Sequence, residues 1–354
     1  MFYREAGQFK TSYAADQAVF PIAQDRIAIA IILTVAFVVV PLFAGEYMLR
    51  AILIPFLVLS LAALGLNLLV GYCGQVSLGT AGFMAVGAYA AYNLSIRIPG
   101  LNLIVVFLLS GGIAALVGIV FGIPSLRIKG FYLAVATLAA QFFLDWLFIR
   151  VQWFTNYTPS GSVSAPPLVI LGIDCSSPQG RYLLVLLIVA VMAVVAKNIV
   201  RGRFGRSWMA MRDMDIAAEI IGIRPMQAKL SAFAVSSFYA GVAGALWAFV
   251  HLGAWEPLAF DINRSFNLLF MVIIGGLGSI LGSFMGAAFI TLLPIFLNQT
   301  PEWLGLPIST AMISHLEFMI FGALIIFFLI AEPHGLARLW QIGKEKLRLW
   351  PFPH

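Results

Sequence analysis

Long runs of apolar residues, separated by short polar segments, recur along the whole chain. A helix needs about 20 consecutive apolar residues to cross the hydrocarbon core of a bilayer. Because several runs are short or broken, the pattern allows nine to eleven spans, and ten is the count that we predict. The ten predicted transmembrane helices cover residues 27–44, 51–70, 79–96, 102–123, 131–149, 182–199, 229–250, 266–280, 282–297 and 313–331.

Lys and Arg residues are concentrated in four segments between or beyond these spans. The basic segments are residues 1–26, 124–130, 197–229 and 332–354. Positively charged loops of membrane proteins stay on the cytoplasmic side, and ten spans with both termini in the cytoplasm place all four segments there. Residues 150–181, which have no Lys or Arg between positions 151 and 180, then form the longest external loop, and residues 298–312 form a shorter one.

The predicted organisation is a single all-α membrane domain with two cytoplasmic ends. Residues 1–26 form an N-terminal segment, residues 27–331 the polytopic transmembrane domain, and residues 332–354 a C-terminal tail. A cytoplasmic loop at residues 200–228 lies between the spans predicted at residues 182–199 and 229–250.

Composition supports this interpretation and excludes most other classes of protein. Hydrophobic residues make up 62% of the 354 residues and charged residues only 10%, against about 45–50% and about 25% in soluble domains. A soluble chain would have too few polar residues to cover its surface. The same composition largely excludes enzymes of aqueous metabolism, disordered scaffolds and nucleic-acid binders. The net charge of +6 does not indicate a nucleic-acid partner, because the basic residues lie in loops between apolar spans. The lipid bilayer is the first partner that the sequence predicts.

A weak internal repeat places a glycine-rich break after two of the spans. Asn67-Leu-Leu precedes the break at residues 71–79, and Asn267-Leu-Leu precedes the break at residues 275–282. Two Gly-interrupted helix pairs at corresponding positions indicate a transport pathway, although two unrelated Gly-rich turns would give the same pattern. The residues expected along the pathway are Asn67, Gly74, Gln75, Ser77, Gly79, Gly275, Gly276, Gly278 and Ser279.

Side chains that carry catalysis or bind metals are sparse. The sequence has no Gly-x-x-x-x-Gly-Lys-Ser/Thr phosphate loop, and its four His and two Cys residues show no metal-ligand spacing. We expect no catalytic residue, no metal site and no bound cofactor in this chain. A membrane enzyme is therefore a distant alternative.

Two acidic residues lie within predicted spans, where a proton- or sodium-coupled carrier would need them. Asp145 lies five residues before Arg150, which predicts an interfacial salt bridge, and Glu317 near His315 is interpreted as an interfacial anchor. Neither residue makes a convincing coupling site. We expect the driving force to lie outside this chain, with a self-sufficient secondary transporter of a small solute as the alternative.

The basic cytoplasmic loop predicts a short amphipathic helix over residues 207–222. Ser207 is placed to cap its N-terminus and Gly222 to end it. One face carries the apolar residues Met211, Met214, Ala218 and Ile221, while Asp215 and Glu219 share another face. A helix this short is marginal on its own. We expect the apolar face to dock on a partner protein or on the membrane surface.

The same loop resembles a known motif. Asp215-Ile-Ala-Ala-Glu-Ile-Ile-Gly222 is similar to the cytoplasmic coupling motif of ABC importer permeases, and residues 203–235 resemble its form in branched-chain amino-acid permeases of the LivM type. Further stretches match the same family at residues 65–79, 87–89, 126–134, 274–282 and 332–336. The resemblance runs in order from about residue 50 to about residue 340.

The resemblance implies a transmembrane permease subunit of an ABC importer in the bacterial inner membrane. It also implies a second, homologous permease, two cytoplasmic ATPases that use ATP and Mg, and a periplasmic solute-binding protein. The solute would be a branched-chain amino acid or a related small polar molecule. The residues expected to couple the ATPases to transport are Arg206, Met211, Arg212, Asp215, Ala217, Ala218, Glu219 and Gly222.

The chain departs from the family pattern at three places. Ile216 stands where Glu is common in the general coupling motif, and residues 155–162 lack the usual Thr-Gly-Gly-Ser-x-Gly pattern. Residues 141–145 read Gln-Phe-Phe-Leu-Asp where the family often has Glu. These differences bear on the substrate, since the family also includes permeases for urea, short amides and aromatic acids.

Overall fold

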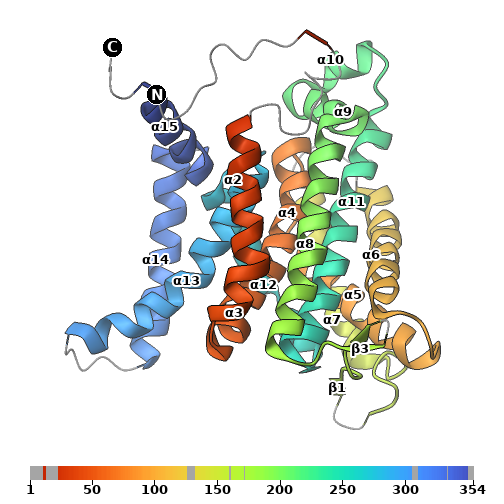
Figure 1. Ribbon diagram of the computed structural model, residues 1–354. Coiled ribbons are helices and arrows are strands. Elements are labelled where there is room, and N and C mark those ends of the chain that lie inside the picture. Colours follow the sequence, from red (N-terminus) through yellow and green to blue (C-terminus); the bar gives the residue numbers. More distant parts are fainter. Residues whose placement is uncertain are drawn as a thin grey trace.

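The computed structural model is a bundle of helices (Figure 1). It describes residues 11–12, 23–125, 132–158, 161–170, 172–304, 310–332 and 334–349. Within these residues, eight helices are long and apolar enough to cross a membrane, which confirms the predicted all-α polytopic class. The N-terminal segment at residues 1–26 lies mostly outside the described residues, as does the part of the LivM-like pattern at residues 126–131.

The helices follow the predicted spans closely. In chain order they are α2 (Ala23–Thr34), α3 (Val40–Phe43), α4 (Ile54–Cys73), α5 (Thr80–Arg97), α6 (Leu103–Ser125), α7 (Tyr132–Arg150), α8 (Pro178–Arg201), α9 (Arg203–Asp213), α10 (Asp215–Ile220), α11 (Pro225–Leu246), α12 (Ile262–Gly275), α13 (Ile280–Leu304), α14 (Thr310–Ala331) and α15 (Gly335–Leu349). Turns of π-helix at Val35–Val39, Met48–Leu53 and Trp247–Leu252 extend α2, α4 and α11, and a 3-10 turn at Pro257–Phe260 precedes α12. Each predicted span overlaps one of these helices, because a helix satisfies every backbone polar group of a long apolar segment within that segment.

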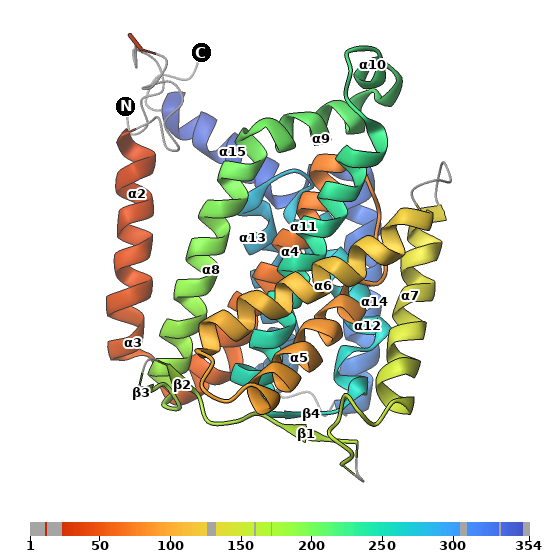
Figure 2. The same ribbon diagram turned by 90° about the vertical axis from the view of Figure 1, so that its right-hand side faces the viewer.

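The centre of the bundle is formed by α4 and α11, both of which are largely buried. α11 lies against α4, α5 and α6 (Figure 2). A Cβ at Gly87 of α5 would overlap the backbone of Gly241 in α11, and a Cβ at Gly244 would overlap the backbone of Met84. Small residues at such contacts allow transmembrane helices to pack backbone to backbone. The core therefore holds α5 tightly against α11.

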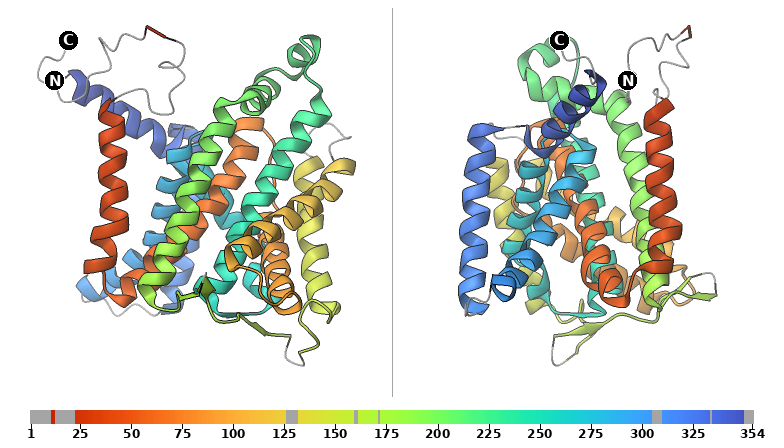
Figure 3. Two further views of the ribbon diagram at one scale, coloured as in Figure 1. Left: turned by 45° about the vertical axis from the view of Figure 1, so that its right-hand side comes forward. Right: turned by 60° about the vertical axis from the view of Figure 1, so that its left-hand side comes forward.

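The first span lies at the edge of the bundle (Figure 3). Its most apolar stretch is not buried by the rest of the chain. It contacts α8, where Tyr182 donates a hydrogen bond from its hydroxyl to Ala36 O at 3.1 Å. The remaining apolar side chains of this span are left to contact lipid or another protein.

Short strands join the loops at the end of the bundle opposite α9 (Figure 2). They lie in the predicted external loop, residues 150–181, and in the connection between α11 and α12. β1 (Val163–Ser164) pairs antiparallel with β4 (Ala254–Trp255), and β2 (Val169–Ile170) pairs with β3 (Ile173–Asp174). The β1–β4 pair therefore ties the long loop to the α11–α12 connection.

The shorter predicted loop, residues 298–312, is only partly correct. α13 continues to Leu304, so the first part of the predicted loop is helical. No glycine occurs between residues 287 and 304, and glycine is the usual residue at which helices end. Residues 305–309 lie outside the described residues.

The C-terminal tail contains the helix α15, which the spacing of apolar runs does not predict. Lys344 Nζ lies 3.3 Å from Asp25 Oδ1, an ion pair that joins α15 to the start of the first span. A Cβ at Gly276, just after α12, would overlap His334 O at the entry to α15. The tail helix is thus in backbone contact with the second predicted break.

Candidate coupling and translocation site

The first predicted break separates α4 from α5 inside the bundle. Gly74 ends α4 in the left-handed conformation, with a φ of 72°, and residues 74–79 are not helical. α5 then begins among buried side chains, where Ala81 N donates to Ser265 Oγ at 2.8 Å. Such a partner satisfies one of the N–H groups that the start of a helix leaves free. Non-helical backbone at membrane depth occurs where it is buried in protein or lines a cavity.

The second predicted break separates α12 from α13, and Asn67 of α4 reaches into it. The Asn67 side chain is fully buried. Its Nδ2 donates to Ser279 O at 2.8 Å and to Ser283 Oγ at 2.9 Å, while its Oδ1 accepts a hydrogen bond from Gly278 N at 2.9 Å. One amide therefore satisfies several polar groups that the interrupted helix would otherwise leave unpaired.

Arg212 of α9 reaches the same place from outside the spans. Its Nη1 donates to Gly71 O in the last turn of α4 at 2.8 Å, and its Nε donates to Asp213 Oδ1 at 2.8 Å. A Cβ at Gly74 would lie 3.0 Å from Arg212 Cγ, and a Cβ at Gly278 would lie 3.5 Å from Arg212 Nη1. A movement of α9 would therefore act on both breaks through one side chain.

Gly71 is the point where the two breaks touch. A Cβ at this position would overlap both Gly278 N and Asn67 Oδ1. The repeat alone did not mark Gly71 as a site residue, but Gly71 lies one helical turn after Asn67, on the same face of α4. We call Asn67, Gly71, Arg212, Gly278 and Ser279 the junction cluster.

The other predicted pathway residues lie along the two breaks rather than in one pocket. Gln75 is only 7% exposed, and within the described residues neither of its amide atoms has a hydrogen-bond partner. Ser77 is buried, and a Cβ at Gly79 would overlap Thr137 O of α7. At the second break, Gly275 is the last residue of α12, where a Cβ would overlap Gly282 O of α13, and Gly276 begins the α12–α13 connection.

The predicted single helix over residues 207–222 is wrong in its extent. The loop forms two helices, α9 and α10, separated by Met214 in an extended conformation with φ −157° and ψ 94°. Ser207 is no N-cap, because it lies inside α9 and donates its hydroxyl to Arg203 O at 3.0 Å. Asp residues flank Met214 on both sides, and Asp favours helix ends over helix interiors. Gly222 follows α10 with a φ of 90° and ends it as predicted.

The predicted apolar face is divided by this break. Met211 and Ala218 are buried, whereas Met214 and Ile221 are 69% and 74% exposed. Ile216 and Ile220 are also exposed, at 70% and 81%. These residues lie on the loop that extends past the ends of the spans (Figure 2). We call Met214, Ile216, Ile220 and Ile221 the α10 patch.

The other predicted coupling residues lie around this patch on the surface. Arg206, Asp215, Ala217 and Glu219 are exposed, and Arg206 Nη1 donates to Arg201 O at 3.0 Å. Within the described residues, Arg212 is the predicted coupling residue whose side chain is hydrogen-bonded to α4 beside the breaks, whereas Arg206 bonds the last residue of the adjoining helix α8.

Trp208 fixes α9 to the bundle, a role that the sequence pattern did not reveal. Its side chain is 1% exposed, and its Nε1 donates to Ser231 Oγ of α11 at 2.9 Å. A buried Trp with a satisfied N–H contributes a large contact area. The sequence feature that could have indicated this role is a Trp between basic residues in a polar loop, since such a large apolar side chain favours burial. Because of this anchor, α9 and the adjoining end of α11 are expected to move together.

The predicted salt bridge between Asp145 and Arg150 is wrong. The Asp145 carboxylate instead accepts hydrogen bonds from Gln141 Nε2 at 3.1 and 3.3 Å. Gln141 also donates to Phe260 O at 2.9 Å and accepts from Gly82 N at 2.6 Å. The carboxylate thus pairs with a residue one turn away on its own helix, and the described residues contain no ion pair between Asp145 and Arg150. The side chain of Glu317 lies outside the described residues.

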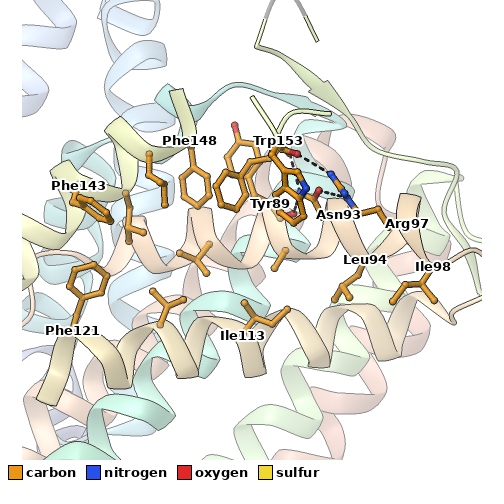
Figure 4. Close-up of a pocket in the computed structure, with 16 residues that line it drawn as sticks. Tyr89, Asn93, Leu94, Arg97, Ile98, Ile113, Phe121, Phe143, Phe148 and Trp153 are labelled. Atoms are coloured by element: carbon orange, nitrogen blue, oxygen red, sulfur yellow. Dashed lines mark hydrogen bonds between the residues drawn. The ribbon is translucent and has the colours of Figure 1, made fainter. Parts of the chain in front are cut away.

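A cavity of about 350 Å³ lies between α5, α6 and α7, apart from the junction cluster (Figure 4). Its walls are almost entirely apolar, which does not suit a polar solute. The described residues contain no group of three His, Cys, Asp or Glu side chains that could hold a metal ion. The polar contacts that join the α9–α10 loop to the spans within the described residues are instead those of Arg212 with the junction cluster and with the first break.

Replacing Asn67 with alanine is expected to lower the free energy of unfolding by about 2–4 kcal/mol. The substitution leaves the part-buried Gly278 N and Ser279 O, and the buried Ser283 Oγ, without this partner. Chemical denaturation in detergent measures the change. Asn298→Ala is the matched control, because Asn298 Nδ2 bonds only Pro294 O of its own helix among the described residues. Equal losses for both variants would contradict the role given to Asn67.

Comparisons with known proteins identify the family of the chain. The family model described as branched-chain amino acid transport system / permease component matches residues 48–331. The high-affinity branched-chain amino acid transport system permease protein LivM of Escherichia coli K12 is 29% identical over 77% of this chain and 66% of its own length. The autoinducer 2 import system permease protein LsrC of Enterobacter sp. strain 638 is 27% identical over 65% of each chain. No solved structure matches the chain.

The matched region contains every feature of the candidate site. It begins at Met48, where the span of α4 starts, and ends at Ala331, where α14 ends. Both breaks, the junction cluster and the α10 patch lie within it. The match covers most of the chain, while the chain spans only 66% of the length of the E. coli relative. This chain therefore belongs to the family of permease components of branched-chain amino acid transport systems.

Proposed function

We propose that the chain is the permease subunit of an ABC importer for a branched-chain amino acid or a related small polar solute. The family consists of transport permeases and not of enzymes. The α10 patch carries the proposal, because its four apolar side chains are mostly exposed beyond the ends of the spans. Apolar side chains grouped on a water-facing loop mark an interaction site. We assign this site to a partner ATPase.

A membrane surface is the other occupant that would suit apolar side chains. The acidic residues Asp213, Asp215 and Glu219 accompany the α10 patch, and all three are exposed. The cytoplasmic surface of a membrane carries negative charge and repels carboxylates. The charged residues of α10 itself, Asp215 and Glu219, therefore favour a protein groove over lipid headgroups, while the basic residues of the loop lie in α9 and on either side of the two helices.

The orientation that we propose has α9, α10 and α15 in the cytoplasm. These helices lie at one end of the bundle (Figure 1), and the basic loop at residues 197–229 and the basic tail belong to them. The positive-inside rule places such segments in the cytoplasm. The β1–β4 pair then faces the periplasm, where a solute-binding protein would dock.

The complete transporter would contain partners that this chain does not provide. Two ATPases would hydrolyse ATP with Mg²⁺ in the cytoplasm, and a second permease, either a homologue or a copy of this chain, would complete the pathway. A periplasmic binding protein would deliver the solute to the bacterial inner membrane. This chain itself would bind no cofactor.

The mechanism that we propose runs from the α10 patch to the two breaks. Closure of the ATPases would displace α9 and α10, and Arg212 would transfer the displacement to Gly71 and the junction cluster. Such a transfer requires contacts that differ between two states. The breaks are suited to this role, because backbone without helical hydrogen bonds can change conformation without breaking a helix.

Gln75 is the residue that we propose to contact the solute. Both atoms of its buried amide lack a partner within the described residues, so it offers one acceptor and two donor hydrogens. An amino acid carries both a carboxylate and an ammonium group, which match this pair of functions. The family relatives are named for branched-chain amino acids and for autoinducer 2, and we propose a branched-chain amino acid as the solute here.

Replacing Gln75 with leucine is expected to raise the KM for uptake about tenfold while increasing thermal stability. The uptake effect follows from one lost hydrogen bond to the solute, and the stability effect follows from removing an unpaired buried amide. Uptake assays and thermal unfolding in detergent give the two readouts. Gln227→Leu, at an exposed position, controls for the change of side chain. A loss of stability with unchanged KM would contradict the assignment.

Replacing Gly222 with valine is expected to uncouple ATP hydrolysis from uptake. Nothing lies within 4 Å of a Cβ at this position, but its φ of 90° is strained for a β-branched residue. Gly222→Asn should retain much more coupling, because Asn tolerates positive φ better than valine does. The ratio of ATP hydrolysed to solute imported, in proteoliposomes, distinguishes the two variants. Equal ratios would show that the backbone at Gly222 does not matter.

Purification of the tagged chain from its native membrane in mild detergent tests the proposed function. Mass spectrometry of the purified sample should identify ATPase subunits and a second permease. The chain alone, accumulating solute in vesicles without ATP, would instead establish a self-sufficient secondary transporter.

A further inference from the structure

The cavity between α5, α6 and α7 has a long, apolar shape (Figure 4). Phe121 and Phe143 lie at one end, and Arg97 and Ile98 lie at the other. Its volume of about 350 Å³ falls within the range of ligand sites in proteins. The proposed transport pathway does not use it, since its lining offers almost no polar surface. We call this cavity the α5–α7 groove.

The α5–α7 groove opens on the outside of the bundle. Phe143 of α7 is 46% exposed, and Ile98 at the end of α5 is 48% exposed. α6 and α7 are long and apolar enough to cross a membrane, which leaves their exposed sides to contact lipid. Side chains lining an unfilled hollow lose their van der Waals contacts on one side. In a membrane, the acyl chains of the surrounding lipids are available to fill a narrow apolar hollow.

The end of the groove at Arg97 carries a positive charge. The Arg97 guanidinium lies 4.0 Å from the ring centroid of Trp153 and donates from Nε to Asn93 Oδ1 at 3.0 Å. Its Nη2 donates to Trp153 O at 3.2 Å. No carboxylate of the described residues lies within ion-pair distance of Arg97. The charge is therefore held in place by neutral partners and left without a counter-ion.

Arg97 lies where lipid headgroups would be. It is the last residue of α5, which packs inside the bundle against α6 and α11, and Trp153 is in the loop after α7, next to the short strands beyond the spans. Trp and Arg side chains are typical of the boundary between hydrocarbon and headgroups. A phosphate at this boundary would pair with the Arg97 guanidinium.

We propose that the α5–α7 groove binds one acyl chain of an anionic phospholipid, with the phosphate at Arg97. The two ends of the site match the two parts of a lipid: apolar walls for the chain and an unpaired guanidinium for the headgroup. The site depends on membrane insertion and not on the proposed import function. Covering of the groove by a partner permease is the competing outcome.

Photo-cross-linking tests the site in the assembled transporter. The purified complex is placed in nanodiscs that contain phosphatidylglycerol or phosphatidylcholine with a diazirine on the acyl chain. After irradiation, mass spectrometry locates the labelled peptides. We expect labels to concentrate on the parts of α5, α6 and α7 that line the groove, and phosphatidylglycerol to label them more strongly than phosphatidylcholine.

Two variants separate the roles of the charge and of the hollow. Arg97→Gln should reduce phosphatidylglycerol labelling about fivefold and phosphatidylcholine labelling by less, because both lipids carry the phosphate but only phosphatidylglycerol has a net negative charge. Ala90→Phe fills the groove and should abolish labelling by both lipids. The matched controls, with wild-type labelling, are Arg150→Gln at the exposed end of α7 and Val120→Phe on the exposed surface of α6.

Three results would overturn the proposal. Labels spread evenly over the exposed surfaces of α6 and α7 would show an ordinary lipid-facing surface. Unchanged labelling of Ala90→Phe, with unfolding and uptake like wild type, would show that the groove holds no chain. Cross-links from these helices to a partner permease, in place of lipid, would assign the groove to a protein interface.

Discussion

Replacing Ile220 with glutamate is expected to abolish ATP-driven uptake while the chain still folds and inserts in the membrane. Ile220 is 81% exposed at the end of α10, so the isolated chain loses no packing. In the complex, the new carboxylate would be buried against an apolar partner surface, which is costly without a counter-charge. Loss of one central apolar contact weakens an interface by about 30-fold or more. Uptake in proteoliposomes and recovery of ATPase with the tagged chain measure the effect.

Leu258→Glu is the matched control for this variant. Leu258 is 73% exposed and lies in the 3-10 turn Pro257–Phe260 at the opposite end of the bundle. The same change of charge should leave ATPase recovery unaffected there. Normal uptake by Ile220→Glu would contradict the assignment of the α10 patch as the binding site for the ATPase.

Replacing Arg212 with alanine is expected to keep the ATPases bound and active but to lower uptake per ATP about tenfold or more. The guanidinium bonds Gly71 O and lies against Gly74, so its removal disconnects α9 from the breaks without changing the α10 patch. Arg212→Lys should restore part of the coupling, since lysine supplies the charge but not the planar donor group. The number of ATP molecules hydrolysed per solute imported is the measurement.

Arg206→Ala is the control for Arg212, because the structure gives Arg206, which the family resemblance marks for coupling, no hydrogen bond to the junction cluster within the described residues. Arg206 is exposed in the same helix, and its Nη1 bonds Arg201 O outside the junction cluster. Its loss should leave the coupling ratio close to that of the unmodified protein. If Arg212→Ala behaves like Arg206→Ala, the junction cluster does not transmit the movement of α9.

The spans and their breaks could be predicted because each depends on local sequence. Apolar runs near 20 residues determine the spans, and Gly74 and Gly276 mark the ends of α4 and α12 through their positive φ values. The repeat also placed Asn67 and Gly278 in the same functional group, and the structure brings them to 2.9 Å. The contact itself joins residues 211 positions apart, and no local pattern contains it.

The coupling loop could be predicted only in part, because two helices and one helix give similar apolar spacing. The division at Met214 turns Ile216 and Ile220 toward solvent and leaves Met211 and Ala218 buried. Arg212 looked like one surface cation among several in a basic loop. Its contact with Gly71 depends on how α9 lies across the end of α4, which is tertiary information. The same holds for Asp145, whose partner is Gln141 rather than Arg150.

The measurement that tests the account most directly is site-specific cross-linking from Ile220 in native membranes. A photo-reactive amino acid at Ile220 is irradiated in cells, and mass spectrometry identifies the adduct. A matched probe at Val120, on the exposed surface of α6, reports contacts within the bilayer. We expect an adduct between position 220 and an ABC ATPase that position 120 does not form. An adduct with lipid alone at position 220, as at position 120, would contradict it.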